Sequence, residues 1–414
     1  MLKNYFKIAI AVLRRRKFFT FISLFGISLT LTVLMVLTAF IEKVTNPVYP
    51  GDKNSRSLYI KRLTYTSKKG WINSGGSSFY FLTHYAGSLK TPVKMAIVSR
   101  NTSSNAYVNN KKIVIDIKYT NADLWNIANY QFIEGKSFTP DQINKADRVA
   151  VISERTRNEY FGDAVTVVGK YIEADNISYR ITGVIKNVPE IEEVFYANMF
   201  LPYTVAKSDY RNKDFWGDYS AILLSPSEQM VTKMRTEYEQ MVTRIPIPDN
   251  MKKDFDTLHS DADTYFETFT RGFFGKADNT GFVRFFVYIS LFVLLFMLLP
   301  TVNLVNVNIT RIMERSSEIG VRKAFGASSK TLVYQFITEN IILTILGGII
   351  GVILTIVILQ VINSSGLIPD LDLNINPLVL LYSLLACLFF GLLSGVYPAW
   401  RMSRLNVVTA LKAQ

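Results

Sequence analysis

Four long apolar stretches constrain what this chain can fold into more than any other feature of its sequence. They contain no charged side chain and occupy residues 18–41, 285–310, 341–362 and 376–400. A hydrocarbon core of about 30 Å is crossed by about 20 helical residues, so each stretch is long enough to be a transmembrane helix. The sequence therefore predicts an α+β membrane protein with four transmembrane helices. A large mixed α/β extracytoplasmic domain is expected between the first two helices.

The first stretch lies where a secretory signal peptide would lie. The length of the apolar region distinguishes a signal peptide from a transmembrane helix. The apolar region of a signal peptide has about 7–15 residues and is followed by a cleavage site of small residues. The stretch here is longer, and the residues that follow it, Glu42 to Thr45, offer no such site. We therefore expect an uncleaved transmembrane helix.

The distribution of lysine and arginine predicts the orientation of the chain. Residues 1–17 form a basic, amphipathic N-terminus without acids, residues 311–340 are net basic, and the tail 401–414 is basic. The loop 363–375 has two acids and no base. Since basic residues accumulate on the cytoplasmic side, both termini and residues 311–340 should be cytoplasmic. Residues 42–284 and the loop 363–375 should lie outside, and the net charge of +13 reflects this topology rather than a nucleic-acid partner.

Residues 42–284 are too long to be a loop and are expected to fold by themselves. Alternating and β-branched runs predict strands at 57–63, 93–98, 111–117, 148–152, 165–172 and 179–184. Ser153 is placed to cap a helix over Glu154–Phe161 that stops at Gly162.

A second helix is predicted after Ser227, and its methionines share a face with Tyr238. Core packing is the main interpretation of that face, and a hydrophobic-ligand surface is the alternative. Glu190, Glu192 and Glu193 are interpreted as a solvated acidic face rather than a metal site. The aromatic run before residue 284 is expected to line the bilayer interface or to pack against a neighbouring domain.

The sequence contains no motif for catalysis or metal binding. It has one cysteine, Cys387, and two histidines, His84 and His259, and it lacks Gly-x-Ser-x-Gly and His-Glu-x-x-His. The strings nearest to a Walker A loop, at 162–170 and 326–331, have the wrong spacing or lack the second glycine. We therefore expect no enzyme activity, no metal site and no cofactor in this chain, so that any nucleotide has to be bound by another chain. A membrane-tethered hydrolase is the interpretation this search disfavours.

The segment after the second apolar stretch has the pattern of a helix, a glycine turn and a second helix. Glu318 and Arg322 are four residues apart and can pair on one helix face. Gly326 suits a left-handed helix stop. The second helix, Thr331–Asn340, is expected to lie at the membrane surface before the third span. From the residues alone, a plain amphipathic connector is an equally good interpretation.

Small residues four apart occur in the last two apolar stretches, at Gly347 and Gly351 and at Gly391 and Gly395. Such pairs let transmembrane helices approach closely, so these four positions are predicted helix-packing sites. Asn303 and Asn306 fall on one face of the second stretch. They are interpreted as interhelical hydrogen-bonding groups or a cytoplasmic extension of the helix, with a polar substrate path as the alternative.

One segment resembles the signature of the MacB/FtsX family of ABC transporter permeases. It is residues 318–327, Glu-Ile-Gly-Val-Arg-Lys-Ala-Phe-Gly-Ala, followed by an apolar span with Gly-Gly-x-x-Gly. Permeases of this family are of the type VII, mechanotransmission type. Three further regions resemble the same family, within residues 11–18, 151–189 and 397–412. Together they cover nearly the whole chain in the family's order.

This resemblance implies the following partners and roles. Two permease chains pair as a homodimer or related heterodimer, and two cytoplasmic ABC ATPase subunits bind ATP and Mg below them. The residues that match the family's ATPase-coupling element are Glu314, Glu318, Ile319, Gly320, Arg322, Lys323 and Gly326. The chain begins only 17 residues before its first span, unlike MacB with its fused ATPase domain, so we expect the ATPase to be a separate chain.

The resemblance also implies a domain organisation and a location. Residues 42–284 correspond to a MacB-like periplasmic domain, with a porter-like part at about 45–100 and 225–280 and a second subdomain at about 101–224. Residues 285–414 correspond to an FtsX-like permease domain. The chain is then a multi-pass protein of the inner membrane.

Efflux of peptides, antibiotics or other amphipathic compounds is the expected function. An FtsX-like regulator of periplasmic cell-wall hydrolases and a lipoprotein-extraction permease are the alternatives. A periplasmic adaptor and an outer-membrane channel are further candidate partners, beside the lipid bilayer.

Overall fold

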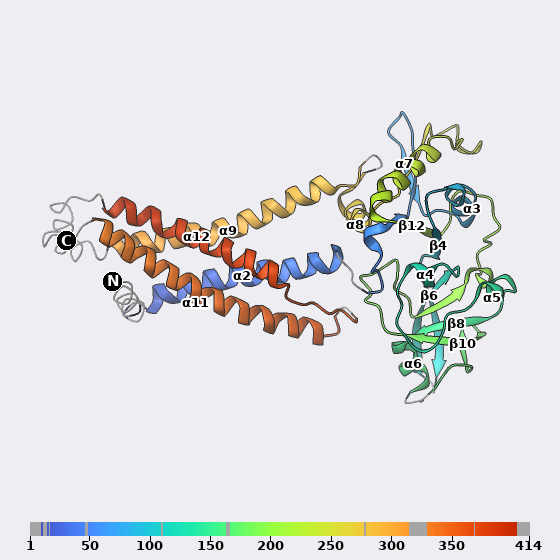
Figure 1. The fold of residues 1–414 in the computed structure, drawn as a ribbon, viewed down its shortest axis with the longest axis horizontal. Helices are drawn as coiled ribbons and strands as arrows, with labels where there is room; N and C mark the ends of the chain where they lie inside the picture. Colours follow the sequence, from blue (N-terminus) through green and yellow to red (C-terminus); the bar gives the residue numbers. More distant parts are fainter. Residues whose placement is uncertain are drawn as a thin grey trace. The chain divides into compact units, whose positions relative to one another are not determined.

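The computed structural model describes residues 10, 15, 17–45, 49–108, 111–162, 166–276, 279–313, 329–367 and 369–403. The chain divides into two compact units (Figure 1). The helical unit comprises Met1–Ile41, Phe286–Ser365 and Asp372–Gln414, and the sheet unit comprises Glu42–Phe285 and Gly366–Leu371. The sheet unit thus extends one residue beyond the predicted outer segment and includes part of the loop between the last two helices.

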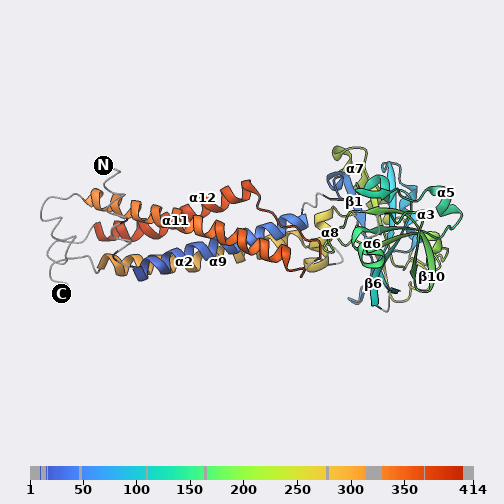
Figure 2. The same ribbon diagram turned by 90° about the horizontal axis from the view of Figure 1, so that it is seen from below.

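Four long helices lie side by side in the described part of the helical unit, as both ribbon views show (Figures 1 and 2). They are α2 (Lys17–Thr45), α9 (Phe282–Met313), α11 (Ser329–Ser364) and α12 (Pro377–Ser403). By length and composition, the described segments Lys17–Thr45, Phe282–Asn303 and Ile337–Ser364 are long and apolar enough to cross a membrane. The apolar segment described in α12, Pro377–Leu393, is shorter, so a fourth span stays a prediction.

Helix α11 corrects one expectation. We predicted a separate surface helix over Thr331–Asn340, but the structure has one continuous helix from Ser329 to Ser364. No glycine or proline occurs between Ser329 and Gly347, so nothing in this part of the sequence ends the helix.

Apolar side chains from different helices form the interior of the helical unit. Leu31 and Met35 of α2 cluster with Met297 of α9 and Cys387 of α12, and Ile27 packs with Leu343 of α11. Many other large apolar side chains of these helices are exposed. Helices that are apolar on all sides are typical of membrane spans, where lipid covers the outward side chains.

A ten-stranded mixed sheet forms most of the sheet unit. Its main path runs in the order β1 (Ser57–Ile60), β12 (Tyr219–Leu224), β4 (Lys94–Ser99), β6 (Lys111–Thr120), β11 (Met199–Pro202), β8 (Val149–Ser153), β10 (Ile177–Ile185) and β7 (Phe132–Gly135). Strand β5 (Thr102–Val108) pairs with β6, and β9 (Tyr171–Ala174) pairs with β10. The pairs β6–β11 and β8–β10 are parallel, and the others are antiparallel.

A second sheet of three strands contains β13 (Thr257–Ser260), β2 (Leu63–Thr66) and β3 (Ile72–Gly75). The predicted strand 57–63 is therefore two strands in two different sheets, β1 and β2. The chain passes from one sheet to the other at Lys61 and Arg62. The link between the two sheets thus consists of two cationic residues.

The strand predicted at 165–172 is also wrong, since the described strand there, β9, begins only at Tyr171. Gly169 has φ +88°, a left-handed conformation that turns the chain before the strand begins. Strand β12 pairs with β1 and β4, which lie in the predicted porter-like part. Its residues were assigned to the second subdomain, and the boundary between the two parts stays a prediction because one sheet runs through both.

Some helices of the sheet unit begin at a residue whose side chain caps them, namely at Ser78, Thr139, Ser153 and Thr264. The helices described in this unit are α3 (Phe79–His84), α4 (Leu124–Ile127), α5 (Pro140–Asn144), α6 (Glu154–Phe161), α7 (Val231–Val242) and α8 (Tyr265–Phe274), with short 3-10 helices η1 (Asn54–Arg56), η2 (Ala86–Ser88), η3 (Tyr203–Val205) and η4 (Glu228–Met230). The prediction for α6 is confirmed: Ser153 Oγ accepts a hydrogen bond from the Thr156 amide, and the helix ends at Gly162. Met234 and Tyr238 of α7 are fully buried in the apolar core, as the packing interpretation expected.

Candidate functional site

The predicted coupling element lies outside the described residues. This holds for Glu314, Glu318, Ile319, Gly320, Arg322, Lys323 and Gly326. Gly395 lies in α12, but its surroundings are not among the described ones either. The roles expected for these residues therefore stay predictions.

The other three predicted packing glycines lie at helix crossings inside the helical unit. A Cβ atom added to Gly347 would lie 2.8 Å from Ile27 Cβ, and one added to Gly351 would lie 3.0 Å from Leu31 Cβ. Gly391 faces Thr344 so closely that a Cβ atom would collide with the threonine hydroxyl. Thr32 Oγ1 also donates to the Gly351 carbonyl oxygen at 3.1 Å. Helices α11 and α2, and α11 and α12, thus approach each other at these glycines.

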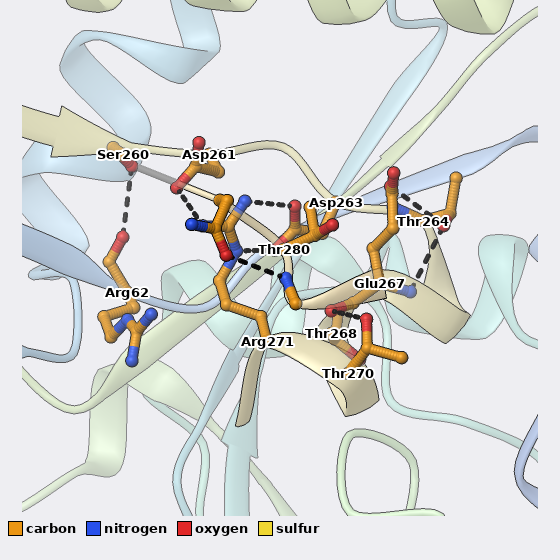
Figure 3. A network of polar contacts seen from close by, with 12 residues as sticks. Arg62, Ser260, Asp261, Asp263, Thr264, Glu267, Thr268, Thr270, Arg271 and Thr280 are labelled. Carbon is orange, nitrogen blue, oxygen red and sulfur yellow. Dashed lines mark hydrogen bonds and ion pairs between the residues drawn. The ribbon is translucent and has the colours of Figure 1, made fainter. Parts of the chain in front are cut away.

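A polar network joins the edge of the large sheet to helix α8 (Figure 3). Asp263 pairs with Tyr59 of β1 through two backbone hydrogen bonds, of 2.7 and 3.0 Å. Helix α8 begins two residues later with a capping box, in which Thr264 and Glu267 satisfy each other's backbone amides. The capping box satisfies backbone donors that would otherwise lack partners at the helix start.

Arg271 of α8 is the centre of this network. Its Nε and Nη2 atoms donate to the two carboxylate oxygens of Asp263 at 2.6 and 2.9 Å, and its Nη1 lies 2.9 Å from Asp261 Oδ2. Only 8% of Arg271 is exposed. The hydrogen bonds and charges of Asp263 and Asp261 raise the pKa of Arg271, although burial opposes them. A buried guanidinium held by two carboxylates fixes α8 against the strand edge, because both partners would be costly to leave unpaired.

Helix α7 is tied to α8 by a second ion pair. Arg235 Nη2 lies 2.5 Å from Glu267 Oε2, and Nη1 donates to Oε1 at 3.1 Å. Although burial opposes it, this pairing, together with the hydrogen bonds from Thr264, lowers the pKa of Glu267. Glu267 therefore serves both as part of the α8 cap and as an anchor to α7.

Helix α8 packs on the first turn of α9 through phenylalanines. Phe285 is buried, and its ring lies 5.4–6.0 Å from the rings of Phe266, Phe269 and Phe274. Arg284 Nη1 also donates to the Phe274 carbonyl oxygen at 2.6 Å. Part of the aromatic run therefore packs within its own unit. The whole arrangement, residues 257–285 with Tyr59, is called the α8 junction below.

Gly281 allows the tight return from α8 to α9. Its φ is +70°, and an added Cβ atom would collide with the backbone of Phe274 and Gly275. A residue with a side chain could not be placed here without moving one of the two helices.

A cleft of 330 Å³ opens beside the α8 junction. It is lined by Lys61, Arg62, Ser74, Gly75, Gly76, Arg100, Asp261, Asp263, Thr268, Arg271 and Gly272. Four cationic side chains thus face two acidic ones, and Arg271 holds both acids. Lys61 and Arg100 also line a smaller neighbouring cavity with the buried Lys118, so the cationic side chains continue beyond the cleft.

Glu192 corrects the prediction of a solvated acidic face. Its side chain is only 1% exposed and lies beside the α8 junction, where Tyr265 Oη donates to Glu192 Oε2 at 3.2 Å. Glu193, by contrast, has a 70% exposed side chain paired with Lys61. Burial raises the pKa of Glu192 to about 7, although Lys43 and the tyrosine hydrogen bond oppose the rise. Sequence spacing did not reveal this difference between adjacent glutamates.

The part of the loop between α11 and α12 that belongs to the sheet unit makes polar contacts there through Asp370. Asp370 accepts an ion-paired hydrogen bond from Arg155, at the start of α6, and a second bond from Asn187 Nδ2 at 3.0 Å. Asn187 Oδ1 also accepts from the Arg155 amide at 2.8 Å, which closes a three-residue network. Sequence reasoning missed this contact because the residues are more than 180 positions apart and no local pattern links them.

The capping box of α8 was, in contrast, visible in the sequence. Thr264-Tyr-Phe-Glu267 followed by apolar residues is a helix-start signal. It would have located α8 and the two residues that anchor it.

The chain matches two known protein families along most of its length. Residues 20–236 match the MacB-like periplasmic core domain, and residues 290–407 match the FtsX-like permease C-terminal domain. The α8 junction lies almost entirely between the two matched ranges.

Curated relatives include the macrolide export ATP-binding/permease proteins MacB of Escherichia coli and Shigella flexneri, each 25% identical over 307 residues. These matches cover 73% of this chain and 44% of each relative, so the chain spans less than half of their length.

Two solved domains are also similar. The periplasmic region of MacB from Actinobacillus actinomycetemcomitans has a TM-score of 0.39 at 10% identity, over 56% of this chain and 97% of that one. The extracellular domain of the noncanonic ABC-type transporter YknZ from Gram-positive bacteria has a TM-score of 0.34 at 14% identity, over 49% and 98%.

Proposed function

Because the chain belongs to the MacB/FtsX family of ABC transporter permeases, an inner-membrane family with a periplasmic domain, we propose that it transmits ATP-driven motion across the membrane to its sheet unit. The chain is a non-catalytic membrane subunit in this scheme. Two copies of a separate cytoplasmic ATPase bind ATP and Mg, and two permease chains pair above them. Residues 314–327 receive the motion, and both chain ends lie in the cytoplasm.

The α8 junction is the observation that carries this proposal. The first turn of α9 is packed into the sheet unit through Phe285, and α8 is in turn held to the edge strand β1 through Asp263 and Arg271. We propose that motion of α9 reaches the sheet through these contacts, which lie within the sheet unit. Buried, fully paired contacts of this kind resist local deformation.

The proposed cargo is an amphipathic compound, a peptide or an antibiotic. The relatives in Escherichia coli and Shigella flexneri are named for macrolide export, which supports this choice. A periplasmic adaptor and an outer-membrane channel would complete the export path.

Fluorescence resonance energy transfer between dyes on the two paired permease chains tests whether ATP-driven motion reaches the sheet unit. The variant Cys387→Ser, Lys112→Cys carries one exposed label site per sheet unit, and the complex is purified with its ATPase. We expect ATP to change the transfer efficiency. Glu318→Ala should abolish this change while ATP hydrolysis continues, because the coupling residue is lost. Arg271→Lys should reduce the ATP-dependent change, because lysine keeps the positive charge but cannot pair with both Asp263 and Asp261 as the guanidinium group does.

Arg244→Lys is the matched control, since Arg244 is exposed and lies outside the junction. The proposal would be wrong if ATP changed the transfer equally in Glu318→Ala and the parent protein. Repeated purification of an active complex without an ATPase would contradict the expected partner. Equal melting temperatures of Arg271→Lys and the parent would show that the loss of signal is not unfolding.

A further inference from the structure

Two arginines in the cleft beside the α8 junction lack an anionic partner. In the described part of the chain, the guanidinium groups of Arg62 and Arg100 make no hydrogen bond or ion pair, whereas Arg271 and Lys61 in the same cleft are both paired. Figure 3 shows the Arg62 guanidinium apart from the Asp261–Arg271 pair, with no contact to the residues drawn.

Arg62 is partly shielded from water, so leaving its charge without an ionic partner costs free energy. Arg62 is half-buried in the short link between β1 and β2, and its backbone is held there by a hydrogen bond from Ser260 Oγ to its carbonyl oxygen at 3.2 Å. Burial and the nearby Arg271 charge lower the pKa of Arg62, although Asp261 and Asp263 oppose them. A partly desolvated cation gains from any anion that enters the cleft.

The two acidic side chains of the cleft are already paired with Arg271 and do not form an ion pair with Arg62. Asp263 gives both carboxylate oxygens to Arg271, and Asp261 lies 2.9 Å from the same guanidinium. Burial raises the pKa of Asp261, although the charges of Arg271 and Arg62 oppose the rise. On this side of the cleft, Arg62 and Arg100 thus lie beside Lys61, which is paired with Glu193, while no hydrogen bond or ion pair of the described residues neutralises the two guanidinium groups.

We propose that this cleft binds a phosphate group, held between Arg62 and Arg100 with Lys61 beside it. Guanidinium groups match phosphate oxygens with paired hydrogen bonds. A phosphate has more acceptor oxygens than a carboxylate and can take donors from several cationic side chains at once. The volume of 330 Å³ admits a small phosphate ester or the head of a larger molecule. This site goes beyond the transmission function and needs no ATPase.

Calorimetric titration of the full chain in a neutral detergent tests the site. The probes are inorganic phosphate, short-chain phosphatidylglycerol and, as a lipid without phosphate, short-chain diacylglycerol. We expect at least one of the first two to bind. Each of Arg62→Gln and Arg100→Gln should weaken that binding about tenfold, and the double variant about a hundredfold, as expected for charge-assisted hydrogen bonds. Arg180→Gln, which removes an exposed cation outside the cleft, should bind as the parent does.

The probes separate the sources of the phosphate. Binding of inorganic phosphate would support a soluble phosphate ligand, and binding of phosphatidylglycerol alone would support a lipid head group. Equal binding of phosphatidylglycerol and the phosphate-free diacylglycerol would overturn the proposal, because acyl chains would then account for it. Absence of binding by both phosphate probes, or unchanged affinity in the double variant, would overturn it as well.

A measurement on the parent protein keeps the test valid if a variant fails to fold. Phenylglyoxal modifies accessible arginines, and mass spectrometry reads each position separately. The bound probe should slow modification of Arg62 and Arg100 at least about threefold and leave Arg180 unchanged. Equal modification with and without the probe would contradict the site.

Discussion

The buried ionisable side chains of the sheet unit differ in how many hydrogen-bond and ion-pair partners they have. Arg271 has two carboxylate partners, whereas Glu192 has one tyrosine hydroxyl and a second oxygen, Oε1, that is buried without a hydrogen-bond partner in the described structure. An unsatisfied buried oxygen disfavours the charged form. Glu192 is therefore a residue beside the α8 junction whose protonation should respond to changes of pH near neutrality.

Glu192→Gln should change how stability depends on pH. The folded-state pKa of Glu192 is raised to about 7, above its ordinary value of 4.5, so the folded protein binds the proton more tightly than the unfolded chain. Stability should therefore fall as pH rises from about 4.5 to about 7, by a few kcal/mol in total. Glutamine cannot ionise, so the variant should melt at a higher temperature than the parent above pH 7.

Melting temperatures of the full chain in detergent, measured from pH 5 to pH 8, check this prediction. Glu190→Gln is the control, because Glu190 is exposed and should show no such pH-dependent gain. A parent-like pH profile in Glu192→Gln would contradict the role of this carboxyl group.

At the scale of elements, the hairpin of α11 and α12 is held at two places. Inside the helical unit, α11 meets α2 at Gly347 and Gly351, where side chains would not fit. Beyond the helices, the loop residue Asp370 is held by Arg155 and Asn187 of the sheet unit. The sheet unit therefore receives the chain after α2, before α9 and at this loop.

Arg155→Ala should loosen the loop 366–371. The ion pair is about three-quarters buried, so its loss should cost about 1 kcal/mol and speed amide exchange of the loop severalfold. Hydrogen exchange with mass spectrometry of peptides covering 366–376 measures this. Arg157→Ala is the matched control on the same helix, since the Arg157 guanidinium donates to the neighbouring Asn158 rather than to the loop.

A double-mutant cycle then separates the pair from other effects. Asp370→Asn should add little to Arg155→Ala, because the same interaction has already been removed. Fully additive effects of the two changes would mean that the observed ion pair contributes nothing to holding the loop.

At the scale of the whole molecule, apolar helices and a sheet unit without a recognised catalytic motif serve one proposed purpose, the export of amphipathic compounds. Deletion of the gene should then raise susceptibility to macrolides or cationic peptides at least about fourfold, and the intact gene should restore resistance while Glu318→Ala should not. Growth inhibition assays measure this. Unchanged susceptibility with cell chaining would instead favour control of wall hydrolases, and lipoprotein accumulating in the inner membrane would favour extraction.

The sequence allowed part of the fold to be predicted and little of the site. Apolar spans, the cap at Ser153 and the core face of α7 were predictable because each depends on residues within one or two turns. The predicted strand 57–63 was split because the change of sheet at Lys61 and Arg62 has no local signal. The surface helix over Thr331–Asn340 was wrong because no residue there stops a helix, which the sequence itself could have indicated.

By itself, the sequence determined that the chain has long apolar helices around a separately folding segment, and which family it resembles. Hydropathy and motif spacing are properties of neighbouring residues, so they can be read without coordinates. Only the tertiary structure decided that Glu192 is buried while Glu193 is exposed, that Arg62 and Arg100 share a cleft, and that Asp370 meets Arg155. These facts depend on which distant segments pack together, and burial and charge pairing are set by that packing rather than by local sequence.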